Sequence, residues 1–185
     1  MLKIDERELA WLTDDEIQRL LNEMENGVNP HVRLISEVCL NTGARWSEAE
    51  GLTNTQVRNQ MVTFAGTKSG KTRSIPISAE LEARLREHFA KHTTFESSLQ
   101  AFRHALKRSG ITLPKGQASH VLRHSFAAHF IMNGGNILTL QKILGHSTIT
   151  MTMRYAHLAP EHLQDAVKLN PMQNLKKCGK KVESQ

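Results

Sequence analysis

The chain has 185 residues, which is enough for one domain with a substantial hydrophobic core. It is 39% hydrophobic and 23% charged, as in soluble globular proteins, and it has no run of about 18 apolar residues that would predict a membrane span. The net charge of +6 and the pI near 9.5 favour a polyanionic partner, nucleic acid first, because cationic side chains neutralise phosphates and release their counterions.

The beginning of the chain and its cysteines indicate where the protein is expected to work. The first residues, Met1 to Glu8, are too charged for the apolar core of a secretory signal. Cys39 lies in an apolar helical stretch and Cys178 in a basic tail, and two cysteines make neither a disulfide framework nor a zinc quartet. We therefore expect a protein that stays in the reducing cytoplasm.

Helix start and stop signals are clear near the N-terminus. Thr13 followed by Glu16 is a capping-box signature, and the apolar residues behind it recur at helical spacing, which predicts a helix from Asp14 to Glu25. The dipeptide Asn29-Pro30 is predicted to start a second helix, which Gly43 ends.

A short third helix is expected from about Ser47 to Leu52, after which the pattern changes. Apolar residues are then separated by polar and glycine-rich stretches, as in a small antiparallel sheet. These residues are Val57, Val62, Phe64, Ile75 and Ile77. Pro76 suits an edge strand, because proline cannot donate to a central ladder.

Helices are predicted again from Ser78 onward. Leu81, Leu85 and Phe89 mark one of them, and Leu99, Phe102 and Leu106 mark another that stops at Gly110. Further helices are expected near Val121–Met132, Ile137–Leu144, Thr148–Arg154 and Glu161–Lys168, before a lysine-rich tail. The predicted fold class is α+β, mainly α-helical with one small three-stranded antiparallel sheet.

The segment Ala65–Thr72, with the sequence A-G-T-K-S-G-K-T, nearly satisfies a phosphate-loop pattern. A phosphate loop must open a helix whose N-terminal amides hold the phosphates, whereas the extended segment Arg73–Ile77 follows here and contains a proline. A β-hairpin whose glycine-bearing turn projects Lys68 and Lys71 fits the sequence better.

His120 and His124 are one helical turn apart and could share a metal ion. No glutamate lies beside His120, and no thiolate or carboxylate cluster accompanies the pair. We therefore expect no metal site and no cofactor.

The segment Thr42–Glu48 carries the first group suited to phosphate chemistry. Gly43 ends one predicted helix and places Arg45 at the mouth of the next. Arg45 could grip a phosphate with two parallel hydrogen bonds, and Glu48, three residues on, could orient it. An ordinary surface salt bridge would explain the same pair if this segment stood alone.

Two later segments add an imidazole, a guanidinium and a phenol. His120 and Arg123 are expected on one face of the helix that follows His120, so that both point at the same spot. His146 follows a glycine, and nine residues after it comes Tyr155, the only tyrosine in the chain. A lone tyrosine is more often a structural residue with a bonded hydroxyl, so only the combination indicates phosphoryl transfer.

Together these segments resemble the tyrosine recombinase family, and most closely the integrases of P-two-like temperate phages. The motifs that carry the resemblance are T-G-A-R, H-V-L-R-H, and L-G-H-S ending at R-Y-A-H, in that order, over roughly Leu12 to Lys168. The family's catalytic set then falls on Arg45, Lys68, His120, Arg123, His146 and Tyr155. Trp46 departs from the pattern, being bulkier than the aliphatic residue more often found after the motif arginine.

The resemblance implies a metal-free and ATP-free phosphoryl transfer. Tyr155 attacks a DNA phosphate held by two arginines, and the product is a 3′-phosphotyrosine link with a released 5′-hydroxyl. Both arginines keep their charge at working pH, whereas a tyrosine with a pKa near 10 needs a base, for which His120 is the candidate. Lys68 is the expected general acid, with Lys71 of the same turn left open as the alternative.

The remaining site residues have supporting roles in this interpretation. His146 is expected to donate a hydrogen bond to the phosphate, and Glu48 and His124 to support the catalytic residues from behind. Lys71, Arg73 and Ser147 are the candidates for direct DNA contact.

The resemblance also implies a domain plan and partners. Residues 1–11 would be a linker from an N-terminal DNA-binding region, residues 12–170 the catalytic domain, and residues 171–185 a basic tail, mobile or packed on a neighbouring subunit. The expected partners are double-stranded attachment sites, three further subunits in a homo-tetramer, a host DNA-bending protein and a phage directionality factor, with no membrane. A type IB topoisomerase and a DNA-binding module that does not cut are the alternatives.

Overall fold

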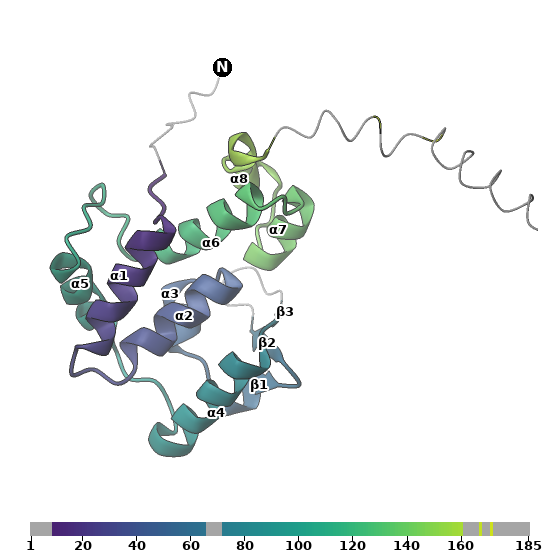
Figure 1. Cartoon of the computed structure of the whole chain (residues 1–185). Coiled ribbons are helices and arrows are strands. Elements are labelled where there is room, and N and C mark those ends of the chain that lie inside the picture. The colour runs from purple at the N-terminus through teal and green to yellow at the C-terminus, as the bar shows by residue number, and fades with distance from the viewer. Residues whose placement is uncertain (1–8, 66–71, 161–166, 168–170, 172–185) are drawn as a thin grey trace, which may run out of the picture.

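The computed structural model describes residues 9–65, 72–160, 167 and 171. It shows a mainly helical α+β domain with one small three-stranded sheet at its edge, in the fold class that the sequence predicts (Figure 1). The elements are α1 (Asp14–Glu25), α2 (Val32–Thr42), α3 (Trp46–Glu50), η1 (Asn54–Gln56), β1 (Val57–Arg58), β2 (Met61–Phe64), β3 (Arg73–Pro76), α4 (Ala79–His92), α5 (Leu99–Arg108), α6 (Val121–Met132), α7 (Ile137–Leu144), α8 (Thr150–Met153) and η2 (Ala156–Leu158). The predicted helix at 161–168 and the hairpin turn with Lys68 and Lys71 lie outside the described residues, apart from position 167.

The helix boundaries follow from their caps. In α1 the Thr13 hydroxyl accepts from the Glu16 backbone, and the Glu16 carboxylate accepts from the Thr13 backbone, so the predicted capping box is confirmed. The helix α2 begins at Val32, later than predicted, because the Asn29 side-chain oxygen caps it by accepting from the backbone N–H of His31 and Val32.

For two other helices the predicted ends differ from the observed ones. The helix α3 begins at Trp46 and ends at Glu50, instead of running from Ser47 to Leu52. The helix α8 covers only Thr150–Met153, shorter than the predicted Thr148–Arg154. Both are short, and the ends of short helices depend on tertiary contacts more than on sequence pattern.

The sheet has the order β1-β2-β3, with both pairs antiparallel. Val57 lies opposite Val62, and Val62 lies opposite Ile75, so one face of the sheet is apolar and buried. Pro76 lies in β3 at the edge of the sheet, as predicted. The helix α4 packs against β1.

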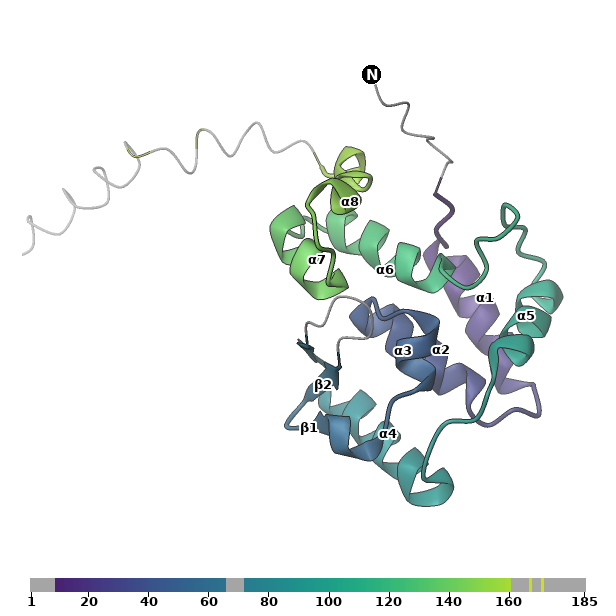
Figure 2. The same cartoon turned by 180° about the vertical axis from the view of Figure 1, so that it is seen from behind.

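The described part of the chain has two hydrophobic clusters. The larger combines residues of α1 to α5, the sheet and the start of α6, and the smaller consists of residues of α6 and α7 together with Tyr155. Both views of the fold show α6, α7 and α8 grouped on one side of α2 and α3 (Figures 1 and 2). Arg123 lies where these two groups of helices meet, because its side chain donates to the carbonyls of Gly43 and Leu144.

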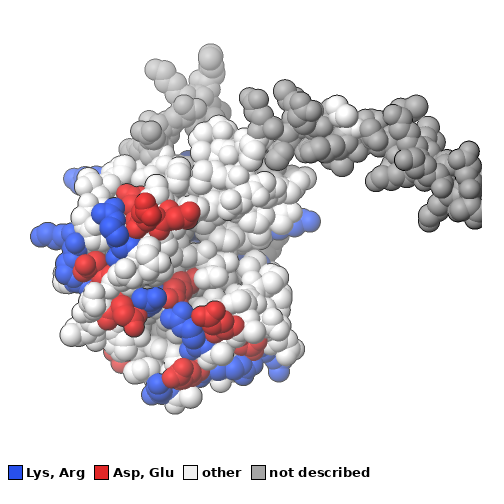
Figure 3. All heavy atoms as spheres, viewed as in Figure 1, with Lys and Arg blue, Asp and Glu red and all other residues white. Residues whose placement is uncertain are grey.

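The face seen in Figure 3 carries positive and negative side chains side by side. Among the described residues, Arg33 pairs with Glu25 at 2.9 Å and Arg108 pairs with Glu23 at 3.0 Å. This face therefore mixes both signs of charge among its described residues instead of forming a continuous basic patch.

Candidate active site

Arg45 stands at the N-terminus of α3, where the chain turns out of α2. Gly43 ends α2 in the left-handed region, at φ 64°, and Arg45 is extended at φ −69° and ψ 152°. The Glu48 carboxylate accepts a hydrogen bond from the Arg45 backbone at 2.8 Å and one from its Nη1 at 2.9 Å. Glu48 thus fixes both the backbone and the guanidinium of Arg45, while 42% of the Arg45 side chain stays exposed.

The same carboxylate also binds Arg73, which sequence reasoning assigned to DNA contact. Arg73 donates from Nη1 at 3.1 Å and from Nη2 at 2.6 Å, and its side chain is only 11% exposed. Its guanidinium carbon lies 4.8 Å from the centre of the Phe64 ring. Arg73 therefore points at Glu48 beneath the site, which does not fit the DNA-contact role we expected.

Glu48 stays ionised in this position. Burial alone would raise its pKa, but the hydrogen bonds from the Arg73 side chain and the Arg45 backbone, together with both positive charges, lower the pKa to about 2. A permanent carboxylate between two guanidinium groups results.

Arg123 joins the two groups of helices. It lies in the first turn of α6 and is 6% exposed. Its Nη1 donates to the Gly43 carbonyl at 2.8 Å and its Nη2 donates to the Leu144 carbonyl at 2.7 Å. Burial, followed by the charges of Arg45 and Arg73, lowers its pKa to about 10, so it remains a cation at neutral pH. Gly43 ends α2 and Leu144 ends α7, so Arg123 is held at the junction of three helices.

Tyr155 is the nucleophile expected from the sequence, and it is 3% exposed. Its hydroxyl lies 2.6 Å from Nδ1 of His124, one turn into α6. Burial raises the pKa of Tyr155, although the charges of Arg123 and Arg154 act in the opposite direction. The phenol is therefore protonated at neutral pH and has an imidazole as its hydrogen-bond partner.

His120 is the N-cap of α6, directly before the helix as predicted, and is exposed. Desolvation, and then the charges of Arg123 and Arg45, lower its pKa. Its ring centre is 6.1 Å from that of His124. The structure thus places His120 at the rim of the site and His124 deeper, beside the tyrosine.

His146 follows the left-handed Gly145 that ends α7. Its Nδ1 lies 2.9 Å from the buried Thr152 hydroxyl, which fixes the ring and leaves Nε2 for another partner. Burial, and then the charges of Arg123 and Arg45, lower the pKa of His146 to about 4. Ser147 is exposed, and its hydroxyl contacts the Met151 sulfur at 3.8 Å.

Five of the predicted catalytic residues are therefore neighbours in one positively charged site. The charges of Arg45 and Arg123 lower the pKa of both His120 and His146, and the charge of Arg123 acts to lower the pKa of Tyr155. Lys68 and Lys71 lie outside the described residues. Sequence reasoning missed Thr152 and Arg154 as neighbours of these groups, although Arg154 adjoins the nucleophile in the printed sequence.

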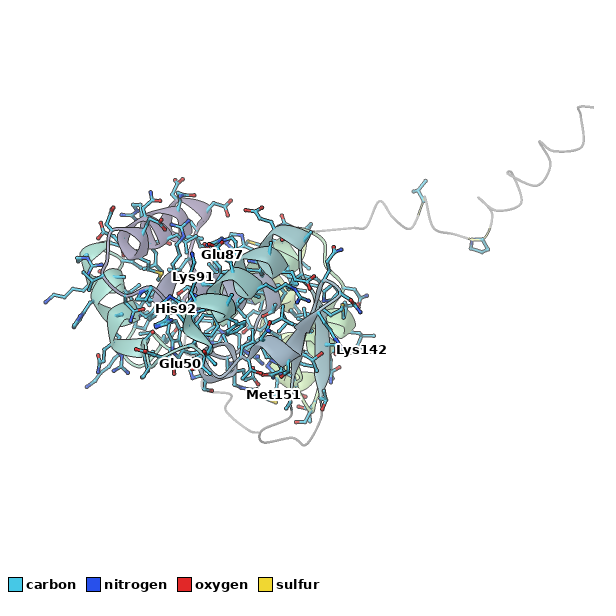
Figure 4. All side chains as sticks on the ribbon, turned by 90° about the horizontal axis from the view of Figure 1, so that it is seen from below. Glu50, Glu87, Lys91, His92, Lys142 and Met151 are labelled. Atoms are coloured by element: carbon cyan, nitrogen blue, oxygen red, sulfur yellow. The ribbon has the colours of Figure 1, made fainter. Side chains whose placement is uncertain are left out.

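Away from this site, three histidines pack together at the start of α2 and along α4. Nδ1 of His31 lies 3.0 Å from Nε2 of His88, and the His92 ring centre is 4.9 Å from that of His31. Figure 4 labels His92 next to Lys91 and Glu87 along α4. Neither these histidines nor any other group of three or more potential ligands within the described ranges is arranged to hold a metal ion.

In chemical terms, the site offers fixed positive charge and hydrogen-bond donors around a buried phenol. Such donors stabilise the extra charge that develops on phosphate oxygens during attack by a nucleophile. An α+β domain with two arginines, two histidines and a tyrosine in this order and arrangement is a catalytic domain of the tyrosine recombinase class.

Comparison with known proteins identifies the family. Residues 10–162 match the family model described as the phage integrase family, and the chain belongs to that family. It is 52% identical over 170 residues to the integrase of Escherichia phage 186 and 44% identical over 171 residues to that of Escherichia phage P2. Each alignment covers 92% of this chain and 50% of the relative, so the chain spans about half the length of these relatives.

A solved structure of the same kind of domain shows the same fold. The catalytic domain of bacteriophage HP1 integrase matches with a TM-score of 0.84 and 56% identity, covering 90% of this chain and 98% of that one. The resemblance to integrases of P2-like phages is thereby confirmed. Within the part of the chain that the structure describes, no helix is both long and apolar enough to cross a membrane.

Proposed function

We propose that this domain performs the DNA cleavage and rejoining steps of site-specific recombination, in the integration and excision of a phage genome. The observation that carries the proposal is the buried Tyr155 hydroxyl, 2.6 Å from His124 and under the influence of the charges of Arg123 and Arg154. A module that only binds DNA needs basic residues, but it does not need a phenol positioned as a nucleophile.

The arginines and His146 act on the scissile phosphate. Arg45 and Arg123 present planar, permanently charged donors to the non-bridging oxygens, and Nε2 of His146 donates a further hydrogen bond. Because their charge is fixed, the reaction needs no metal ion, and because the phosphotyrosine link preserves the energy of the broken bond, it needs no ATP. Removing one such donor typically slows a reaction by about 100- to 1,000-fold.

Tyr155 attacks the phosphorus atom, and the bond from phosphorus to the 5′ oxygen breaks. The phenolic proton passes to His124, which we now favour over His120 because its Nδ1 is already within hydrogen-bond distance. Burial, and then the charge of His120, hold the pKa of His124 at about 4, and an anionic phosphate bound nearby raises it towards the range of a useful base.

The departing 5′ oxygen takes a proton from a lysine of the hairpin turn, Lys68 or the alternative Lys71, and the product is a 3′-phosphotyrosine link. A second 5′-hydroxyl reverses the reaction in a new pairing. Ser147 is exposed and keeps the DNA-contact role predicted from the sequence. Arg73 is paired with Glu48 and loses that role.

The whole protein needs more than this domain. We propose that residues 1–11 link it to an N-terminal DNA-binding region, and that residues 171–185 form a tail that is mobile or packs on a neighbouring subunit. Four subunits then act on two attachment sites in the bacterial cytoplasm, with a host DNA-bending protein and a phage directionality factor.

The test is covalent adduct formation on a nicked suicide duplex that carries an attachment site of a related phage. Wild-type protein is expected to form the adduct equally well in excess EDTA, whereas Tyr155→Phe binds the duplex and forms none. An adduct with Tyr155→Phe, or loss of activity in EDTA, would contradict the mechanism. Relaxation of a supercoiled plasmid by single subunits, without strand exchange, would favour a topoisomerase instead.

A further inference from the structure

The negative charge of Glu48 reduces the positive potential that Arg45 can offer to a phosphate. Its carboxylate is 4% exposed and ionised, and it lies 2.9 Å from Nη1 of Arg45. An isolated pair of this kind has no net charge, so Arg45 would offer little positive potential to a phosphate. Arg73 adds a second guanidinium to the same carboxylate, which returns the trio to a net charge of +1.

We propose that Arg73 is a positioning residue for Arg45, acting through Glu48 and making no contact with DNA. The inference rests on the proposed function, because it concerns how the phosphate-binding arginine is held and charged.

The geometry separates Arg73 from an ordinary surface cation. Oε1 of Glu48 accepts from Nη1 of both arginines, and Oε2 accepts from the Arg45 backbone and from Nη2 of Arg73. Every hydrogen bond from Arg73 in this set therefore goes to the carboxylate that orients Arg45. The Arg73 side chain is 11% exposed and that of Arg45 is 42% exposed, so Arg45 is the arginine of the two that is accessible to a phosphate.

Two further contacts fix the Arg73 side chain from both sides. Its guanidinium stacks over Phe64, which lies directly opposite it in the sheet. On the other side it covers Gly145, where an added Cβ would come within 3.4 Å of the Arg73 Cδ. His146 is the next residue, so one side chain braces the segments that supply Arg45 and His146 to the site.

Three variants of the full chain test the role. Arg73→Gln removes the charge, Arg73→Lys keeps the charge but cannot bind Glu48 with two parallel hydrogen bonds, and Arg58→Gln removes an exposed arginine from β1 as a matched control. Each is checked for folding by thermal unfolding. Cleavage is measured in single turnover at saturating suicide duplex, and affinity is measured separately over a range of salt concentrations.

We expect Arg73→Gln to slow cleavage by about 10- to 100-fold, as for a displaced catalytic group, with unchanged affinity and an unchanged salt slope. Arg73→Lys should recover part of the rate, and Arg58→Gln should cleave as wild type. Weaker binding with a salt slope reduced by about one would overturn the proposal, because that is the result for a direct phosphate contact. Unimpaired cleavage by Arg73→Gln would overturn it too.

A second substrate separates positioning of Arg45 from a general loss of order. A methylphosphonate at the scissile position replaces a charged oxygen with a methyl group, so less charge has to be stabilised. The defect of Arg73→Gln should shrink on this substrate in parallel with that of Arg45→Ala. A defect of the same size on both substrates would contradict an action through Arg45.

One measurement does not depend on cleavage. The Glu48 carboxyl carbon can be followed by NMR as the pH is lowered, and Arg73→Gln should raise its pKa well above about 2. An unchanged titration would overturn the proposal even if wild-type protein formed no adduct. Absence of a wild-type adduct together with a raised Glu48 pKa would leave the positioning role in place and contradict the proposed function alone.

Discussion

The Tyr155 hydroxyl and the His124 ring form a hydrogen bond of 2.6 Å between two elements 31 residues apart in the chain. Tyr155 is buried and precedes the short turn η2, whereas His124 lies in the first half of α6. In the proposed mechanism, holding the hydroxyl in one place reduces the entropy that must be lost when the tyrosine attacks. It also gives the phenolic proton a defined acceptor.

We expect His124→Ala to slow adduct formation by at least about 10-fold, because general-base catalysis commonly contributes 100-fold or more. His124→Gln should recover part of the rate, since an amide can still hold the hydroxyl. The measurement is single-turnover cleavage at saturating duplex, with His104→Ala, an exposed position on α5, as the control. If His120→Ala is slowed and His124→Ala is not, the proton goes to the residue first predicted from the sequence.

The histidine cluster of α2 and α4 predicts a loss of stability in mild acid. Burial, and then the nearby His31 and His92, lower the pKa of His88 from 6.5 to about 4. Between these values the unfolded chain binds more protons than the folded one, so stability is complete above pH 6.5 and is lost as the pH falls towards 4. His124 and His146 act in the same direction.

The urea midpoint of wild-type protein should therefore fall between pH 7 and pH 5. In His88→Gln the fall should be smaller but still present, because His124 and His146 remain. His104→Gln, at an exposed position, serves as the control and should behave as wild type. Equal slopes for wild type and His88→Gln would show that His88 is not the source.

Local signals were enough to predict much of the fold. The bounds of α1, α6 and α7 agree with the sequence prediction, because caps and apolar spacing act within a few residues. The three strands and the edge position of Pro76 were also predicted correctly. Contacts between distant segments were not predictable in this way.

Two site residues illustrate the limit. His124 was expected only to support the catalytic residues, but its Nδ1 lies 2.6 Å from the Tyr155 hydroxyl, and this contact joins residues 31 positions apart. Arg73 looked like a free cation in a basic hairpin, and its pairing with Glu48 depends on β3 lying beside α3. Neither fact is encoded within a window of a few residues.

The structure accounts for Trp46, the departure from the family pattern. Its ring centre is 4.9 Å from that of Phe102 on α5, and its Nε1 donates to Glu50 at 3.0 Å. Glu50 also accepts from the Ser98 backbone at 2.7 Å. Trp46 thus packs α3, whose N-cap is Arg45, against α5 and the segment leading into it.

We expect Trp46→Leu to lower the free energy of unfolding by about 2–4 kcal/mol, from lost ring contact and a vacated cavity. Trp46→Phe should lose about 1 kcal/mol, because the ring contact remains and one hydrogen bond is lost. Urea denaturation at pH 7 gives both values. A loss below about 0.5 kcal/mol in Trp46→Leu would mean that the contact with Phe102 does not hold α3 in place.

Alanine substitutions at Gly43 and Gly110 distinguish the cost of backbone strain from the cost of crowding at the site. Gly43 and Gly110 have φ values of 64° and 71°, so alanine is strained at both, by about 1–2 kcal/mol. An added Cβ at Gly110 meets nothing within 4 Å, whereas at Gly43 it would lie 2.6 Å from a carbon of Phe126 and 2.8 Å from one of Leu144.

Gly110→Ala should therefore cost only the strain and leave cleavage unchanged. Gly43→Ala should cost about 1–3 kcal/mol more, because the crowded side chains have to move. Its cleavage rate should also fall, since the Gly43 and Leu144 carbonyls are the two acceptors that hold Arg123. Urea denaturation and adduct formation on the two variants check both parts, and equal cleavage rates would show that the crowding at position 43 does not displace Arg123.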